Sequence, residues 1–128
     1  KGWEYAILTD EITRAWSGMS TRQYKNLKGL KKENLRDNMT DLELVLTMLS
    51  EATTTEISKK EQPEGFAENL EVARSGGEIA GDTRKAIERR TGKPVVSAQN
   101  AAQLNGVVTG IIEAAAAPEP DKPEDSQN

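Results

Sequence analysis

Two clusters of basic residues have the types and spacing that phosphate binding requires. Between residues 20 and 36, six cations are opposed only by Glu33, so the net charge of this segment is +5. Between residues 84 and 93, five cations are opposed only by Glu88, so the net charge there is +4. Because guanidinium and ammonium groups neutralise phosphates, clusters of this kind predict contact with nucleic acid.

The predicted contact residues come from both clusters. They are Arg22, Lys25, Lys28, Lys31, Lys32, Arg36, Arg84, Lys85, Arg89 and Arg90. Amide side chains that could reach base edges accompany the first cluster, namely Gln23, Asn26, Asn34 and Asn38. A solvated basic surface accounts for the same residues equally well. Part of the positive charge of the second cluster is also explained by its favourable interaction with the partial negative charge at a helix C-terminus.

Other kinds of chemistry have little support in the composition. The chain contains no Cys and no His, which excludes disulfides, thiolate or imidazole metal sites and His-based catalytic triads within it. The carboxylates are spread singly among lysines and arginines, as on solvated helix faces. The glycine-rich segment at residues 75–82 lacks the GxxxxGK[ST] pattern of a phosphate loop. We therefore predict a protein that is not an enzyme and that has no metal site and no cofactor.

Length and composition predict one all-α domain. The 128 residues include 35% apolar and 30% charged residues, which is typical of a soluble helical protein, and strand-forming residues are sparse. No stretch approaches the roughly 18 apolar residues of a membrane span, and no signal peptide is evident, so we predict no membrane contact and a cytoplasmic location. Because the chain begins with Lys, we expect it to be part of a longer protein.

The best-specified helix begins after Thr40, where Thr40 and Glu43 form a capping-box pattern. Apolar residues then recur at three- and four-residue spacing, which predicts the core face of this helix. These residues are Leu42, Val45, Leu46, Leu49 and Ala52. Pro63 is expected to end the helix.

Three shorter elements precede this core helix. A first helix over residues 3–17 is expected to place Tyr5 and Trp16 on its buried face and to end at Gly18. Trp3 and Trp16 could serve as interface aromatics, but core packing is favoured for both. A second begins at Ser20 or Thr21 and closes at Lys28-Gly29, and a brief third element covers residues 30–39. A short helix, a glycine turn and another short basic helix match the outline of a helix-turn-helix.

The segment from residue 64 to residue 91 predicts either one long helix or two helices broken at Gly76-Gly77. A near-heptad apolar spacing that continues across the glycine pair favours one helix, which Gly92 and Pro94 then end. Val95-Val96 is expected to pack in an extended conformation, and Ser97 to cap a small helix over residues 98–104. The prediction is a domain of about five helices over residues 1–105, followed by a flexible, acidic and Pro-containing tail over residues 106–128.

Two segments carry a resemblance to a known family. KGLKKENLRDNMT at residues 28–40, and GG followed by TR and TGKPVVS within residues 76–97, resemble the C-terminal region of prophage antirepressor proteins of the BRO type. The similarity extends over about residues 3–104 and includes the corresponding part of DNA-damage-inducible protein D. In these families the N-terminal BRO domain is generally regarded as the DNA-binding part, and that domain is absent from this chain.

The resemblance implies a helical accessory domain for protein contact, oligomerisation or support of nucleic-acid binding. We accordingly expect a non-enzymatic regulatory module that contacts a regulatory protein, such as a repressor or a recombinase filament, in transcription or in a DNA-damage response. The alternative is direct DNA binding through residues 22–36 and 84–93. The family supplies no established active residues to transfer.

Overall fold

Residues 2–99 are the part of the chain that this computed structural model describes, and they contain four α-helices and one short 3-10 helix. The helices are α1 (Gly2–Ser17), α2 (Thr21–Leu27), α3 (Asp41–Glu61) and α4 (Gly65–Thr91), and the 3-10 helix η1 covers Arg36–Asn38. No strand occurs within residues 2–99, which confirms the all-α prediction. The predicted boundary at residue 105 and the predicted tail lie outside the described residues, as does most of the small helix expected after Ser97.

Local sequence signals set most of the helix ends. The Thr40 hydroxyl accepts the Glu43 N–H at 3.3 Å while the Thr40 N–H donates to the Glu43 carboxylate at 2.8 Å, so the predicted capping box is present. Ser20 caps α2 in the same way. Gly18 and Gly92 have left-handed φ values of 83° and 74°, which glycine adopts without the steric cost of a Cβ.

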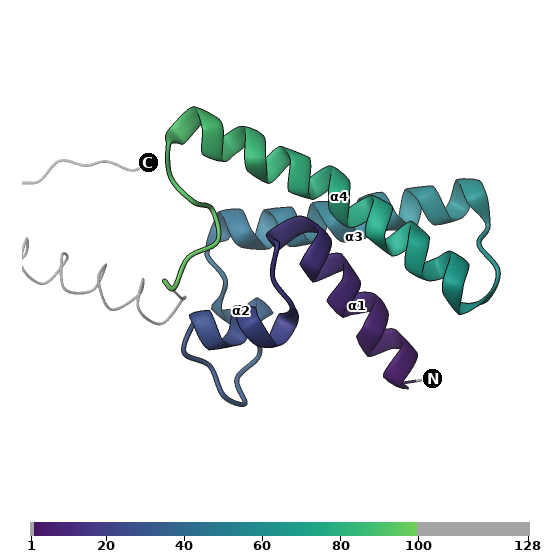
Figure 1. The fold of residues 1–128 in the computed structure, drawn as a ribbon, viewed down its shortest axis with the longest axis horizontal. Coiled ribbons are helices and arrows are strands. Elements are labelled where there is room, and N and C mark those ends of the chain that lie inside the picture. Colours follow the sequence, from purple (N-terminus) through teal and green to yellow (C-terminus); the bar gives the residue numbers. More distant parts are fainter. Residues whose placement is uncertain (1, 100–128) are drawn as a thin grey trace, which may run out of the picture.

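Helix α4 is the central element, because it packs along both α1 and α3 (Figure 1). It runs unbroken from Gly65 to Thr91, so Gly76-Gly77 lies inside one helix, as the near-heptad spacing favoured. A Cβ on Gly76 would lie 2.0 Å from the Thr54 Oγ1 of α3, and one on Gly81 would lie 2.6 Å from the Ala15 carbonyl oxygen of α1. The glycines therefore allow two neighbouring helices to approach the α4 backbone.

The apolar core lies at the end of the molecule where α2, the start of α3 and the C-terminal half of α4 meet. Trp16 and Tyr24 are its largest members, and their ring centroids are 6.0 Å apart. Its buried residues are Trp16, Tyr24, Leu30, Leu35, Met39, Leu46, Ala80 and Val95. The expected packing role of Val95-Val96 is thus confirmed.

The predicted core face of α3 is wrong for most of its residues. Leu46 is buried, but Leu42 and Val45 are 39% and 56% exposed and Ala52 is exposed as well. The buried face carries Glu43 and Ser50 instead. Glu43 makes hydrogen bonds and an ion pair, and the Ser50 hydroxyl donates to the Leu46 carbonyl at 2.9 Å, so the main cost of burying polar groups is removed. Small side chains on this face let α3 approach its neighbours.

The N-terminal half of α1 also departs from the prediction. Trp16 is fully buried as expected, but Trp3 is 60% exposed and Tyr5 is 73% exposed. This half of α1 extends away from α2 and from the apolar core (Figure 1), so no element within residues 2–99 covers its outer side. Trp3 retains one aromatic neighbour, Phe66 of α4, at a centroid distance of 6.0 Å.

The helix-turn-helix outline is wrong, because no α-helix follows the glycine turn within residues 30–40. This segment is a loop that contains only the single turn of η1. The Asn34 side chain accepts the Asp37 N–H at 3.1 Å, and the Asn38 side chain donates to the Asn34 carbonyl at 2.8 Å. Such local bonds compete with helix formation. The loop is held by Leu30, Leu35 and Met39, which enter the core.

None of the helices within residues 2–99 combines the length and the apolar character that a membrane span requires.

Candidate nucleic-acid interface

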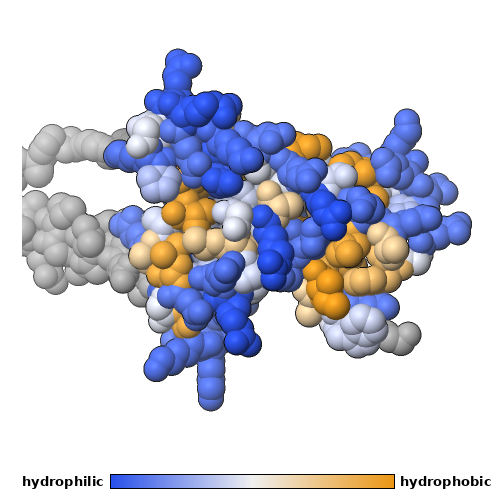
Figure 2. Space-filling view, in the orientation of Figure 1, coloured by the Kyte–Doolittle hydropathy of each residue, from blue (hydrophilic) through white to orange (hydrophobic). Residues whose placement is uncertain are grey.

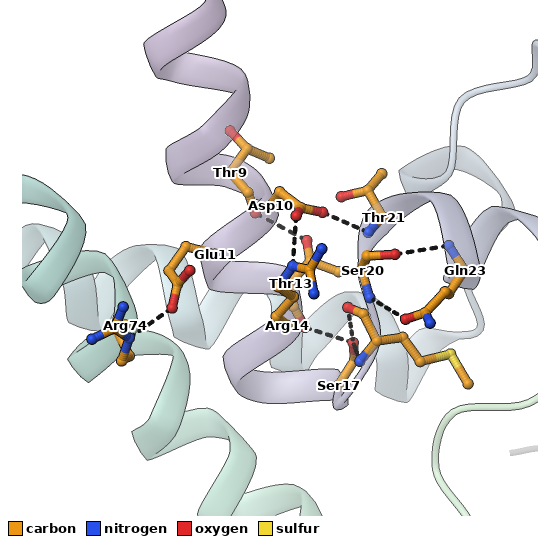
Figure 3. Close-up of polar contacts among 11 residues, drawn as sticks. Thr9, Asp10, Glu11, Thr13, Arg14, Ser17, Ser20, Thr21, Gln23 and Arg74 are labelled. Carbon is orange, nitrogen blue, oxygen red and sulfur yellow. Dashed lines mark hydrogen bonds and ion pairs between the residues drawn. The ribbon is translucent and has the colours of Figure 1, made fainter. Parts of the chain in front are cut away.

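The first basic cluster is positioned by the corner between α1 and α2, which polar contacts fix (Figure 3). The Asp10 carboxylate of α1 accepts the Thr21 N–H at the start of α2 at 2.7 Å and also accepts the Arg14 Nε at 2.8 Å. The Ser17 hydroxyl donates to the Thr13 carbonyl and accepts the Met19 N–H at 3.1 Å. The direction in which α2 leaves α1 is thus set by side chains of α1.

Asp10 is ionised in this arrangement. Partial burial disfavours the charged form, but the Thr21 N–H and the Arg14 guanidinium outweigh it, so the pKa of Asp10 lies below its ordinary value of 3.8. On the opposite side of α1, Arg74 of α4 donates to the Glu11 carboxylate at 2.7 Å (Figure 3). Helix α1 is therefore tied by charged side chains to both α2 and α4.

An open groove of about 800 Å³ lies between α1 and α2, and three of the predicted contact residues line it. Arg22 and Lys31 are exposed, and Lys25 is half-buried. The residues lining the groove are Tyr5, Ala6, Thr9, Asp10, Thr21, Arg22, Lys25, Asn26, Leu30 and Lys31. We refer to it as the α1–α2 groove. Among these residues Asp10 is the one carboxylate, and it is already engaged by Thr21 and Arg14.

Tyr5 gives the α1–α2 groove an aromatic wall. Its side chain is 73% exposed, and it also lines a second, smaller groove of about 320 Å³ between α1, α3 and α4. An exposed aromatic ring beside cations and an amide, here Asn26, is the combination that binds a base together with its phosphate. The sequence analysis predicted that Tyr5 is buried in the core and therefore missed it as a groove residue. Nothing in the residues around Tyr5 indicates that this part of α1 lies away from the apolar core.

Lys28 does not belong to the basic surface, which corrects its place in the predicted set. Its side chain is fully buried, and Lys28 Nζ lies 2.6 Å from Glu43 Oε1, with neither side chain exposed. Lys28 Nζ also donates to the Gln99 carbonyl, and it lies 5.8 Å from the Tyr24 ring centroid. The ammonium group is therefore held inside the protein and cannot reach a phosphate.

The Lys28–Glu43 pair joins three distant parts of the chain. Glu43 Oε2 accepts the Ser97 N–H at 3.1 Å, so the pair connects the end of α2, the first turn of α3 and residues 97–99. Burial raises the pKa of Tyr24 well above its ordinary value, and the Glu43 carboxylate raises it further. The Tyr24 hydroxyl lies near that carboxylate without reaching hydrogen-bond geometry.

The remaining residues of the first cluster lie outside the groove. Lys32 is exposed in the loop, and its N–H donates to the Glu33 carboxylate at 3.1 Å. Arg36 is exposed but its Nη1 is 2.7 Å from Glu51 Oε2 of α3. The groove therefore gathers Arg22, Lys25 and Lys31 and leaves the other three apart.

The second basic cluster is at the C-terminal end of α4. Arg84 has a structural role, because its Nε donates to the Trp16 carbonyl at 2.6 Å and its Nη1 to Glu88 at 2.9 Å. Glu88 also accepts the Val95 N–H at 3.0 Å; this bond, with Arg84, holds the pKa of Glu88 below its usual value even though partial burial opposes it. Lys85, Arg89 and Arg90 are exposed.

The structure does not join the two clusters into one surface. The end of α4 and α2 lie at the same end of the molecule, on opposite sides of the start of α3 (Figure 1). Figure 2 shows hydrophilic side chains projecting over both places, with a band of apolar residues between them. The arrangement offers two separate cationic patches, and the one at the α1–α2 groove is concave.

Metal binding has no support in the described part of the chain, where no group of three or more acidic residues converges as metal ligands would. Comparisons with known proteins add no identification: no family model matches the chain, and neither the curated proteins nor the solved structures give a significant match.

Proposed function

We propose that this domain is a non-enzymatic regulatory module that contacts nucleic acid through the α1–α2 groove. The observation that carries the proposal is the convergence of Arg22, Lys25 and Lys31 on one concave surface beside the exposed ring of Tyr5. Cations hold the sugar-phosphate backbone while an aromatic face stacks a base, and neither interaction selects a particular sequence. The resemblance of residues 28–40 and 76–97 to BRO-type antirepressors supports a setting in DNA-linked regulation.

The test is the salt dependence of binding to single-stranded and duplex oligonucleotides. Replacing Arg22 and Lys31 with Gln removes two phosphate contacts, so the slope of log affinity against log salt falls by roughly 1.4 on single strands and 1.8 on duplexes. Lys59→Gln with Lys60→Gln is the matched control, because both residues are exposed at the far end of α3 and the net charge changes equally. Equal slopes in the two double variants would overturn the groove assignment.

Variants of Tyr5 distinguish binding of single strands from binding of duplexes. Tyr5→Ala weakens single-strand binding by about 1–3 kcal/mol through the lost base stacking, while Tyr5→Phe keeps the affinity. Duplex binding is unchanged in both variants, because paired bases are not free to stack on the ring. Loss of duplex and single-strand affinity together would show that Tyr5 supports the fold and not a base.

A second candidate function, contact with a regulatory protein, is favoured by the outer side of α3. Leu42, Val45, Met48 and Ala52 follow one another at three- and four-residue spacing and are all exposed, which gives an apolar stripe along this helix. Exposed apolar stripes of this kind are found where a protein binds another polypeptide. Association of the domain with a repressor or a recombinase filament, weakened by Val45→Asp but not by Ser75→Asp on α4, is the corresponding test.

A further inference from the structure

The exposed stripe of α3, formed by Leu42, Val45, Met48 and Ala52, has no covering element within residues 2–99. Met48 and Val45 are 51% and 56% exposed, although Leu46 in the same helix is buried at 2% exposure. Helix α3 thus has two distinct faces. One packs against α1 and α4, and the other carries the exposed apolar stripe. Apolar surface is stabilised when a complementary segment removes it from water.

The described chain ends beside the start of this stripe. Ser97 donates its N–H to Glu43, and the carbonyl of Gln99 accepts from Lys28, which pairs with Glu43. Glu43 is adjacent to Leu42, the first residue of the stripe, but it points to the buried face. The five backbone steps from Gln99 to Leu104 can span up to about 17 Å when extended, which is enough for half the circumference, about 16 Å, of a helix about 10 Å in diameter.

The sequence that follows this short connection has a matching apolar pattern. Between residues 104 and 116, apolar residues recur at three- and four-residue spacing, and Glu113 is the one charged residue. These apolar residues are Leu104, Val107, Val108, Ile111, Ile112 and Ala115. At about 1.5 Å per residue, eleven helical steps from Leu104 to Ala115 cover about 16 Å, and the ten from Leu42 to Ala52 cover about 15 Å. The two stripes therefore differ in length by only one helical step.

The glycines within this segment favour docking over an isolated helix. Gly106 and Gly110 each lower helix stability by about 1 kcal/mol relative to Ala, so thirteen residues alone fall short of a stable helix in water. Packing of the apolar side on another surface supplies the missing stabilisation. The acidic and Pro-containing residues after Ala117 have no such apolar pattern.

The small area of the stripe favours a tethered occupant over a second copy of the chain. Three side chains that are 39%, 56% and 51% exposed, together with the small side chain of Ala52, offer far less than the ~800 Å² per partner that a stable dimer interface requires. A segment joined by a short connection has an effective concentration in the millimolar range, so a small contact area is sufficient.

We propose that residues 104–116 of this chain cover the exposed apolar stripe of α3, running from Leu42 towards Ala52. Any protein partner that uses the same face has to displace this segment, which makes the face a regulated one. The covering contact itself requires neither nucleic acid nor a partner.

Oxidation of Met48 by hydrogen peroxide in the full chain tests this proposal. Ile111→Asp places a charge in the apolar pattern of residues 104–116, whereas Thr109→Asp places the same charge on its polar side and is the matched control. We expect peptide mass spectrometry to show slow Met48 oxidation in the wild type and in Thr109→Asp, and oxidation several-fold faster in Ile111→Asp. Met39, which is buried at 9% exposure, stays slow in all three if the fold is intact.

Two results would overturn the proposal. The first is an equal rate of Met48 oxidation in all three proteins. The second is protection of Met48 that disappears on dilution, which would assign the face to a second copy of the chain. Because the chain contains no Cys, an engineered Val45→Cys and Val108→Cys pair provides an independent readout. It should form an intramolecular disulfide, whereas Ser75→Cys with Val108→Cys should not.

These measurements use no nucleic acid and no partner, so their failure is distinguishable from failure of the proposed function. Met48 protection without any partner binding would leave the covering segment in place and remove the protein-contact function. An unprotected Met48, in a protein whose groove variants still lower the salt slope as expected, would refute the covering segment and leave the nucleic-acid function in place.

Discussion

Lys28 illustrates how a single residue can leave a predicted functional set. It lies between Lys25 and Lys31 in the sequence, and its charge contributed to the net +5 of that segment. Helix α2 ends at Leu27, so Lys28 occupies the helix C-cap and turns inward to Glu43. The net charge of a segment gives the number of cations along the chain, but it does not show the direction in which each side chain points. The basic surface is therefore smaller than the basic segment.

Loss of the Lys28 ammonium leaves the Glu43 carboxylate buried without its cation, so Lys28→Met destabilises the domain. We expect a decrease of about 3–5 kcal/mol in the free energy of unfolding, measured by urea denaturation. Lys31→Met, which removes the same charge from an exposed position, is the control and changes stability by a few tenths of a kcal/mol. A loss below about 1 kcal/mol for Lys28→Met would show that the pair is not an important connection between α2 and α3.

Asp10 predicts a specific dependence of stability on pH. Its pKa is lower in the folded protein than the ordinary 3.8, so the folded state binds its proton less tightly than the unfolded chain does. The resulting stabilisation is present above about pH 4 and is lost as the pH falls through the folded-state value. Asp10→Asn keeps an acceptor for the Thr21 N–H but removes the charge.

The variant should therefore be less stable than the wild type at pH 7, and the difference should shrink by pH 3. Urea denaturation at the two pH values measures this. Asp82→Asn makes the same chemical change at an exposed position of α4 and serves as the control. A difference that stays constant between pH 7 and pH 3 would mean that the charge of Asp10 contributes nothing and only its hydrogen bond does.

At the scale of helices, the signals that could be predicted are the ones that act locally. The Thr40–Glu43 capping box and the left-handed Gly18 and Gly92 are set by a few neighbouring residues, and the structure contains all of them. The face that α3 buries is set by other helices, and apolar spacing alone does not reveal it. The same limit applies to the groove, because the α1–α2 corner is what brings Tyr5 and Asp10 of α1 to the same groove as Arg22 of α2.

The glycines of α4 provide a test of close packing between helices. Replacing Gly81 with Ala raises intrinsic helix propensity by about 1 kcal/mol, which in an exposed helix would be stabilising. Here the new Cβ would lie 2.6 Å from the Ala15 carbonyl oxygen, a backbone atom that cannot move aside without shifting α1. We expect a net loss of about 1–3 kcal/mol in the free energy of unfolding.

Ser75→Ala, at an exposed position of the same helix, controls for propensity and is expected to be neutral or slightly stabilising. Chemical denaturation of both variants distinguishes the two effects. A stabilised Gly81→Ala protein would mean that α1 and α4 do not approach as closely as the packing at Gly81 indicates.

At the scale of the whole molecule, the two basic patches lie on opposite sides of the start of α3, which determines how a long ligand can use them. A short oligonucleotide bound in the α1–α2 groove does not reach Arg89 and Arg90 at the end of α4. We therefore expect Arg89→Gln with Arg90→Gln to leave the salt slope of a short strand unchanged, while Arg22→Gln with Lys31→Gln lowers it by about 1.4.

A long strand can wrap from one patch to the other, and then both pairs of cations contribute. Because the two patches lie on opposite sides of the start of α3 (Figure 1), the losses in binding free energy from the two double variants should add within about 0.5 kcal/mol in the quadruple variant. The measurement is a salt titration of all four proteins with a short and a long strand of the same base composition. If Arg89→Gln with Arg90→Gln lowers the slope on the short strand and the groove variant does not, the nucleic-acid contact belongs to the end of α4, and Arg22, Lys25 and Lys31 only solvate the surface.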